Sequence, residues 1–321
     1  MSERNRTLRL SPAEAARLAG RCVGKADLAD RPLAPGMLAV GDAVDLLAHV
    51  PDASVDLVFA DPPYNLDKRF GTHAGRAMSL DAYEAWVRTW IEPLRRVLKP
   101  HGSLYVCGDW RSSTALHRVL DQHFVVRNRI TWEREKGRGA RSNWKNASED
   151  VWFATVGDEY TFDADAVRVR RRVVAPYRDS AGAPKDWQEK SGLRYRDTAP
   201  SNLWTDLTVP FWSMPENTEH PTQKPEKLLA KVILASSRPG DVVLDPFAGS
   251  GTTLAVAEKL GRRWIGIEID RDHACVALRR LELASVEPRI QGYADSVFWE
   301  RNSRPSASDP TEIDHERAPA E

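Results

Sequence analysis

Apolar positions along the chain alternate between short continuous runs and longer stretches with helical spacing. The run VDLVFA at 55–60 is largely apolar, as in a parallel strand that is buried on both faces. From 81 to 98, apolar residues recur at every third or fourth position and predict an amphipathic helix. Asp81, with Glu84 three residues later, resembles a capping box at the start of this helix.

The same rhythm recurs on both sides of an irregular middle region. Pro225 falls near the first turn of one predicted helix, a position that proline favours. Repeated β–α units imply a mostly parallel sheet of the Rossmann-like, doubly wound α/β type. Further strands are predicted at 37–40, 103–108, 125–132, 150–156, 241–245 and 263–269, and further helices at 42–50, 112–122, 224–237, 252–260 and 271–283.

Breaks in this pattern divide the chain into five segments. Residues 1–36 mix Arg, Ala and Pro with weak periodicity and are interpreted as a partly ordered N-terminal arm. Residues 157–218 are polar, Arg-rich and punctuated by proline, which indicates an insertion that handles a substrate. Residues 301–321 are rich in Ser, Pro, Asp and Glu, and we expect a disordered acidic tail. Residues 37–156 and 219–300 are then the two halves of one domain.

Composition adds few restrictions. The chain has 321 residues, of which 41% are hydrophobic, so a sizeable core can form. Its 46 basic and 46 acidic residues cancel, so the total charge argues neither for nor against a nucleic-acid partner. The first ten residues are too charged for a signal peptide, and no apolar run approaches the roughly 18 residues of a membrane span. We therefore expect a soluble cytoplasmic protein.

The cysteines give no sign of a metal centre. Cys22, Cys107 and Cys275 are far apart and form neither a zinc pattern nor a disulfide framework. They are interpreted as small core residues in a reducing compartment. No metal is expected.

A glycine-containing loop follows the strand predicted at 241–245. Gly249 and Gly251 would let the backbone approach a ligand closely, and the helix that follows offers free N–H groups to it. About twenty residues later the next strand ends in an acid, where a carboxylate can bind a ribose diol. Glu268 is the candidate, with Asp270 second.

Three ligand classes could use such a loop. A phosphate-binding P-loop needs a lysine that GSGTT lacks, and a dinucleotide fingerprint needs glycine where Leu254 stands. Asp245 would also sit awkwardly beside a pyrophosphate. A ligand with a ribose and a cationic amino-acid end fits better, because acids end both strands. S-adenosylmethionine is such a ligand, and a plain tight turn is the alternative.

The tetrapeptide DPPY at 61–64, which by itself could be only a turn, completes the pattern. Together with DPFAGSGTT at 245–253, it resembles the amino-methylating DNA methyltransferases. The tetrapeptide comes before the glycine loop, which is similar to the circularly permuted β group of that family. HPTQKP at 220–225 and the block at 41–65 are similar to that group too. The resemblance covers about residues 37–285 and implies a permuted S-adenosylmethionine-dependent methyltransferase fold with a target-recognition insertion.

This resemblance implies a chemistry for the tetrapeptide. An exocyclic amino nitrogen is a poor nucleophile because its lone pair delocalises into the base. The Asp61 carboxylate and the Pro62 carbonyl can accept its two N–H groups, with Pro63 holding the backbone extended. Tyr64 can stack on a base that has left the duplex. Aspartate at the first position favours adenine N6 as the target, with cytosine N4 as the alternative.

Further roles are implied by the resemblance, each beside a structural alternative. Asp42 would contact the adenine of the cofactor or cap a helix, and Phe247 would pack on the cofactor or in the core. Thr222 and Lys224 would hold the methionine carboxylate or cap a helix, and Trp132 would form a second wall of the base pocket or be buried. The full set expected to bind the cofactor is Asp42, Asp61, Thr222, Lys224, Asp245, Phe247, Gly249, Ser250, Gly251, Thr252 and Glu268.

Contacts with double-stranded DNA are expected from local charge. The basic stretch 127–145 contains Arg138, Arg141 and Lys145, which we expect to contact the substrate, and a second basic zone spans 167–196. Two solvated basic faces are the alternative. The acidic tail would balance this charge overall.

Residues 157–218 are the candidate for target recognition and could equally help to form a homodimer. A cognate restriction endonuclease is a further partner that the sequence leaves open. A catalytically silent DNA-binding relative is the competing reading from another class, and the intact DPPY and FAGSG motifs argue against it.

Overall fold

The computed structural model describes residues 5–66, 68–70, 73–75, 77–134, 142, 144–173, 177–190, 193–301 and 303. Nine described strands form one sheet, which is parallel from β1 through β6, while β8 runs antiparallel to both of its neighbours. The prediction of a mostly parallel α/β sheet is confirmed. In sheet order the strands are β1 (Val23–Gly24), β2 (Met37–Val40), β14 (Arg263–Glu268), β13 (Val242–Asp245), β3 (Val55–Ala60), β6 (Leu98–Gly108), β8 (Ser148–Thr155), β7 (Val125–Glu133) and β12 (Leu203–Trp204).

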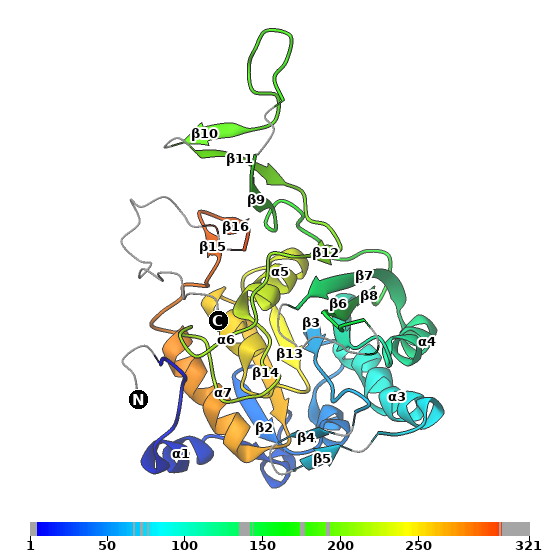
Figure 1. Cartoon of the computed structure of the whole chain (residues 1–321). Coiled ribbons are helices and arrows are strands. Elements are labelled where there is room, and N and C mark those ends of the chain that lie inside the picture. The colour runs from blue at the N-terminus through cyan, green and yellow to red at the C-terminus, as the bar shows by residue number, and fades with distance from the viewer. Residues whose placement is uncertain are drawn as a thin grey trace.

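Helices cover both faces of this sheet (Figure 1). Alternate residues of β3 point to opposite faces, so Leu57 and Phe59 join one hydrophobic core while Val58 and Ala60 join the other. The first core includes α1 (Pro12–Ala19), α5 (Glu226–Ser236), α6 (Thr252–Lys259) and α7 (Arg271–Ala284); the second includes α2 (Ala43–Leu46), the 3₁₀ turns η1 (Lys25–Leu28) and η2 (Leu47–His49), α3 (Leu80–Val97) and α4 (Ser113–His123).

The order of the strands brings distant parts of the chain together. β13 lies between β14 and β3, with Leu244 opposite Val58, although the two strands are far apart in sequence. The helix after β13 packs on one face and the helix after β3 packs on the other. Ligands bind at such a topological switch point, at the carboxyl ends of the strands. In this chain those ends lead into Asp245 and Asp61.

Several predicted boundaries shift. The capping box of Asp81 and Glu84 is wrong, because α3 starts after Ser79, whose hydroxyl accepts from the N–H of Ala82 at 3.2 Å. The helix predicted at 42–50 is α-helical only to Leu46 and then continues as a 3₁₀ turn. Pro225 is the N-cap of α5 and not a residue of its first turn.

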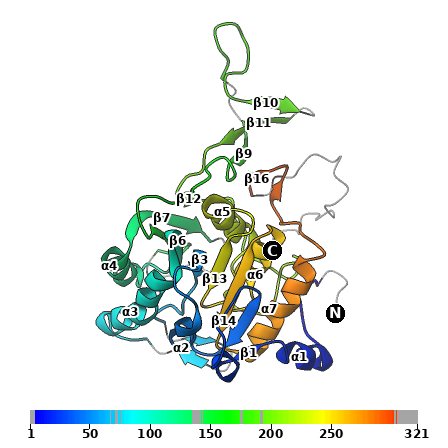
Figure 2. The same cartoon turned by 180° about the vertical axis from the view of Figure 1, so that it is seen from behind.

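The irregular middle region contributes to a second sheet. Its strands are β10 (Gln188–Lys190), β11 (Leu193–Thr198), β9 (Val169–Arg172), β16 (Val297–Trp299) and β15 (Tyr293–Ala294). β15 and β16, the last two strands of the expected cofactor half, therefore belong to this second sheet and not to the main sheet. β16 pairs with β9. β10, β11 and the segment before them project from the body in both views (Figure 1 and Figure 2). A separate hairpin joins β4 (Lys68–Phe70) and β5 (His73–Gly75).

The N-terminal arm is more regular than its weak periodicity indicates. Ser11 and Glu14 form a capping box at the start of α1, and Arg17 pairs with Glu282 of α7 at 2.7 Å. β1 then extends the main sheet at its edge. Of the expected acidic tail, all but residues 301 and 303 lies outside the described residues. The described helices include none that is long and apolar enough to cross a membrane.

Candidate active site

A cavity of about 280 Å³ opens at the switch point, where the tetrapeptide and the glycine loop face each other. Segments nearly two hundred positions apart thus line one space. Of the residues expected at the site, those that line this cavity are Asp42, Asp61, Pro62, Pro63, Tyr64, Thr222, Lys224, Asp245, Phe247, Gly249, Ser250, Thr252 and Glu268.

The two glycines of the loop serve different purposes. Both have positive φ angles, 51° at Gly249 and 77° at Gly251, which favour glycine. A Cβ atom at Gly251 would lie 2.5 Å from the Cβ of Ala277, so this glycine lets α7 approach the loop. Gly249 instead lines the cavity and donates its N–H to the carboxylate of Glu268 at 2.6 Å.

Asp42, Asp245, Glu268 and Asp270 line the cavity together with Asp61. Asp245 is buried and accepts from the N–H of Phe247 at 2.9 Å and from the hydroxyl of Thr253. Burial raises the pKa of Asp245 to about 7. Glu268 also accepts from the N–H of Asp270 at 2.9 Å. Asp42 caps α2 through the N–H of Val44 at 2.8 Å while it lines the cavity, so the structural alternative holds beside the proposed one.

An aromatic cluster supports one wall. The ring of Phe247 meets Trp90 edge to face, with centroids 5.1 Å apart, and lies 6.3 Å from Trp86. All three side chains line the cavity. Phe247 therefore packs on the core and also offers apolar surface to a ligand.

Asp61, at the end of β3, has both carboxylate oxygens engaged. Its Oδ2 lies 2.6 Å from the ammonium of Lys224, and its Oδ1 accepts from the hydroxyl of Tyr64 at 3.1 Å. The carbonyl of Pro63 accepts from the hydroxyl of Tyr83 at 3.3 Å, which anchors the tetrapeptide to α3. Burial raises the pKa of Asp61, and the positive charge of Lys224 opposes this rise.

Lys224 lines the cavity as expected, and its charge partners there are two carboxylates that the sequence did not indicate. In this structure its ammonium pairs with Asp61 and lies 3.4 Å from the carboxylate of Glu149. It also sits 5.4 Å from the ring centre of Tyr64. Burial disfavours its charge, but the two carboxylates outweigh burial and raise the pKa of Lys224. Lys224 is therefore a cation held at the tetrapeptide.

Glu149 was missed by sequence reasoning. It lies on β8 on the same face as Val151 and Phe153, because side chains alternate along a strand. An acid on a face that is otherwise apolar is a signal that could have been noticed, since buried acids are rare unless paired. Arg134 pairs with its Oε1 atom.

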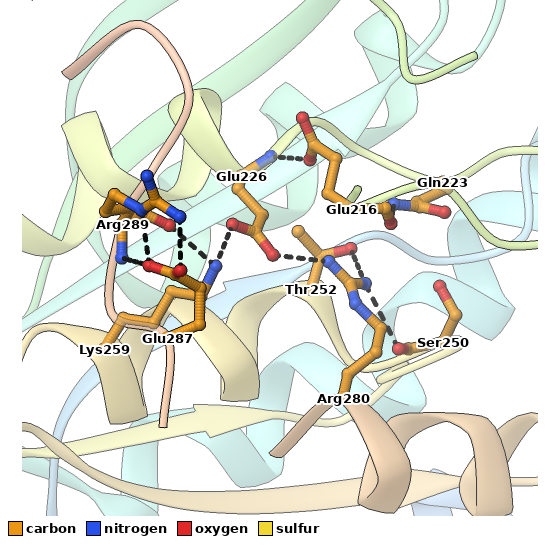
Figure 3. A network of polar contacts seen from close by, with 9 residues as sticks. All are labelled: Glu216, Gln223, Glu226, Ser250, Thr252, Lys259, Arg280, Glu287 and Arg289. Atoms are coloured by element: carbon orange, nitrogen blue, oxygen red, sulfur yellow. Dashed lines mark hydrogen bonds and ion pairs between the residues drawn. The ribbon is translucent and has the colours of Figure 1, made fainter. Parts of the chain in front are cut away.

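A polar network clamps the segment around HPTQKP against the glycine loop (Figure 3). Arg280 of α7 donates to the carbonyl of Ser250 at 3.2 Å and to the hydroxyl of Thr252 at 2.8 Å. It also pairs with Glu226 at 3.0 Å, and the N–H of Glu226 donates to the carboxylate of Glu216 at 2.7 Å. Burial raises the pKa of Glu216 to about 8, and the charge of Glu226 adds to this rise.

The residues expected to meet the substrate are placed less uniformly. Trp132 is 1% exposed, lies opposite Glu149 in the β7–β8 ladder, and is not among the residues that line this cavity. Lys145 is exposed, whereas Arg138 and Arg141 lie outside the described residues. Much of the second basic zone is neutralised internally, since Arg168, Arg170, Arg194 and Arg196 pair with Asp165, Asp197, Glu189 and Asp186.

A second cavity of about 480 Å³ lies between β7, β9 and α5, and it contains neither motif. Within the ranges that the structure describes, no three His, Cys, Asp or Glu side chains are grouped to hold a metal ion.

Comparison with known proteins agrees with this geometry. The family described as DNA methylase matches residues 55–279. The chain is 38% identical to the DNA adenine methyltransferase YhdJ of Escherichia coli (strain K12) over 252 residues, which cover 76% of this chain and 82% of that protein. It is 33% identical to the type II methyltransferase M.HpaI of Haemophilus parainfluenzae over 248 residues, covering 76% of this chain and 74% of that protein.

Solved structures share the fold. The PvuII DNA methyltransferase, which is cytosine-N4-specific, superposes with a TM-score of 0.56 at 21% identity, over 78% of this chain and 87% of that one. A Thermus thermophilus protein, solved in complex with S-adenosyl-L-methionine, gives a TM-score of 0.53 at 21% identity, over 84% of this chain and 99% of that one.

Proposed function

This chain belongs to the DNA methylase family, and on that premise we propose that it transfers a methyl group from S-adenosylmethionine to adenine N6 at a specific site in double-stranded DNA. One observation carries the proposal: Asp61–Pro62–Pro63–Tyr64 and the loop at Gly249 line a single cavity. The relative that is 38% identical is named for action on adenine, which supports the choice of base.

The groups around the glycine loop suit S-adenosylmethionine. The buried carboxylate of Asp245 matches the cationic amino-acid end of that molecule, and the carboxylate of Glu268, which lines the cavity, matches its ribose hydroxyls. Asp42 can accept from its adenine amino group, and Phe247 can pack on the ring. When bound, S-adenosylmethionine supplies a methyl group that carries the electrophilic character of a sulfonium.

The tetrapeptide is placed to hold the amino group of the target base. The Asp61 carboxylate accepts one N–H and the Pro62 carbonyl accepts the other, which localises the nitrogen lone pair toward the methyl group. Lys224 favours the ionised form of Asp61 by pairing with it at 2.6 Å. Tyr64 offers its ring to the extruded base. Catalysis then depends on positioning and electrostatics.

The projecting part of the second sheet is our candidate for target recognition. Two guanidinium groups lie near the ring of Trp187 there, Arg178 at 5.2 Å and Arg194 at 5.4 Å from the ring centre. Tyr177, beside them, is 70% exposed. Arginine and aromatic side chains on a projecting element suit contacts with the phosphates and a groove of the duplex. We include in this proposal a homodimer, a companion restriction endonuclease and action in the cytoplasm.

The test is to identify the methylated base. Plasmid DNA is incubated with the protein and methyl-labelled S-adenosylmethionine, then digested to nucleosides. We expect the label in N6-methyldeoxyadenosine. Label in N4-methyldeoxycytidine would assign the alternative base, and DNA binding without label would assign a silent DNA-binding protein.

A further inference from the structure

Glu149 is the acid nearest to the tetrapeptide that neither motif contains. It is the second residue of β8, and one strand, β6, lies between β8 and β3 in the sheet. Its side chain is only 6% exposed. A carboxylate that is so deeply buried needs partners of opposite charge or hydrogen-bond donors.

Those partners are the partners of Asp61. Glu149 Oε2 accepts from the hydroxyl of Tyr64 at 3.2 Å and lies 3.4 Å from the ammonium of Lys224. The same hydroxyl lies 3.1 Å from Asp61 Oδ1, and the same ammonium lies 2.6 Å from Asp61 Oδ2. The four groups form a closed ring, and Arg134 holds the remaining oxygen of Glu149.

The single proton of Tyr64 has two acceptors in this ring. Burial raises the pKa of Tyr64, and the charges of Asp61 and Glu149 raise it further, so the phenol keeps its proton. One hydroxyl donates fully to only one acceptor at a time. When it donates to Asp61, Oδ1 is engaged; when it donates to Glu149, Oδ1 is available to another donor.

Resting on the methyltransferase function proposed above, we propose that Glu149 is a positioning residue of the methyl-transfer site. It takes the hydroxyl of Tyr64 and steadies Lys224, so that Oδ1 of Asp61 is free to accept an N–H of the target amino group. The Tyr64 hydroxyl then stays hydrogen-bonded when the base enters, as a buried polar group requires.

The alternative is that Glu149 only balances the charges of Arg134 and Lys224, and the pH dependence of the transfer rate tests the proposal. Burial raises the pKa of Asp61, Lys224 lowers it, and the negative charge of Glu149 raises it again. The groups that face Asp61 are Lys224 from the loop before α5, Glu149 from β8, Cys107 from β6, Asp245 from β13 and Tyr64 of the tetrapeptide. Removing the charge of Glu149 should therefore move the acid limb of the transfer rate to lower pH.

The experiment compares Glu149→Gln and Glu149→Ala in the full-length protein, by single-turnover transfer of labelled methyl groups to DNA across pH. We expect Glu149→Ala to slow transfer by about tenfold or more, with cofactor affinity retained. Glu149→Gln keeps an acceptor oxygen, so it should recover part of the rate and show the shifted acid limb. Transfer by Glu149→Ala at the wild-type rate, or an acid limb that stays in place in Glu149→Gln, would overturn the proposal.

Asp206→Asn is the matched control. Asp206 is another buried carboxylate held by two lysines, Lys227 at 2.9 Å and Lys231, at a distance from the tetrapeptide. Its loss should change thermal stability and leave the acid limb in place. A shift of the limb in this control would assign the Glu149 effect to general charge loss and overturn the proposal.

A second measurement needs no turnover. A double-mutant cycle of Tyr64→Phe and Glu149→Gln on thermal unfolding should show coupling, because the two groups are in contact. If the two substitutions changed thermal stability additively, the contact between the two groups would be absent and the proposal would be wrong. If the cycle shows coupling but the wild-type protein methylates no DNA, the contact is real and the proposed function is refuted.

Discussion

The ammonium of Lys224 lies 2.6 Å from a carboxylate oxygen of Asp61, although 163 positions separate the two residues in the chain. The pair joins the two segments DPPY and HPTQKP inside the cavity. An isolated carboxylate in this buried position would favour its protonated form. The contact therefore explains how Asp61 can accept a hydrogen bond at neutral pH.

Replacing Lys224 tests that explanation. Lys224→Met removes the positive charge that lowers the pKa of Asp61, so the acid limb of the transfer rate should move to higher pH. This direction is opposite to that expected for Glu149→Gln. Lys231→Met, which removes a buried lysine paired with Asp206, is the control and should leave the limb unchanged. An unshifted limb in Lys224→Met would show that Lys224 does not set the charge of Asp61.

If Asp245 binds the cofactor as proposed, cofactor binding should depend on pH. The raised pKa of Asp245, about 7, means that the carboxylate is increasingly protonated as the pH falls below that value. Because only the ionised form attracts a cation, affinity for S-adenosylmethionine should weaken by up to about tenfold per pH unit below that point and level off above it. Calorimetric titration across this range measures the effect. Asp245→Asn should bind weakly at every pH, and a wild-type affinity that is flat through neutrality would contradict the assignment.

Glu216 should make the free energy of unfolding depend on pH. Its pKa is raised from 4.5 to about 8 in the folded protein, so the folded state holds a proton that the unfolded state releases. The contribution of Glu216 to stability is fully present below the pKa that it has in the unfolded chain. This contribution is lost as the pH rises through the pKa that it has in the folded protein. Between those two pKa values, the free energy of unfolding of the wild-type protein should fall with rising pH more steeply than that of Glu216→Gln. The difference in slope should be up to about 1.4 kcal/mol per pH unit. Parallel curves from denaturant unfolding would rule this out.

Gly251 should tolerate no side chain. Alanine there would combine a positive φ of 77° with a Cβ only 2.5 Å from that of Ala277. Gly261 has a φ of 70° with nothing within 4 Å of its Cβ position, so Gly261→Ala carries the backbone strain alone. Gly251→Ala should lose about 1–3 kcal/mol more than this control in unfolding experiments, together with cofactor affinity. Equal losses in the two variants would show that the close approach of α7 is unimportant.

Much of the main sheet was predictable because its strands are buried on both faces. The strand at 55–60 and the strand at 37–40 match β3 and β2 in full, since burial of both faces gives a continuous apolar run. The arm and the last strands were harder, because β1 and β15 have two residues each and carry too little pattern. Their places are decided by the tertiary partners α7 and β9.

The candidate site was predictable as far as its motifs reached. Asp61 and Gly249 share a cavity because β3 and β13 are neighbours, which periodicity alone does not encode. Lys224 was expected at the cofactor because a sequence motif indicates the site to which a residue belongs. A motif does not indicate which side chain the residue contacts within that site. Glu149 reaches the site because β8 pairs with β6, which is a long-range contact. The only local sign of it in the sequence is an acid beside apolar residues on one face of the strand.

Single-turnover methyl transfer by Asp61→Ala tests the role proposed for the tetrapeptide, with cofactor affinity measured in parallel. If the Asp61 carboxylate holds the amino group of the target base, the variant should lose transfer by at least about a hundredfold and still bind S-adenosylmethionine. Transfer at the wild-type rate by a variant that lacks this carboxylate would contradict the account.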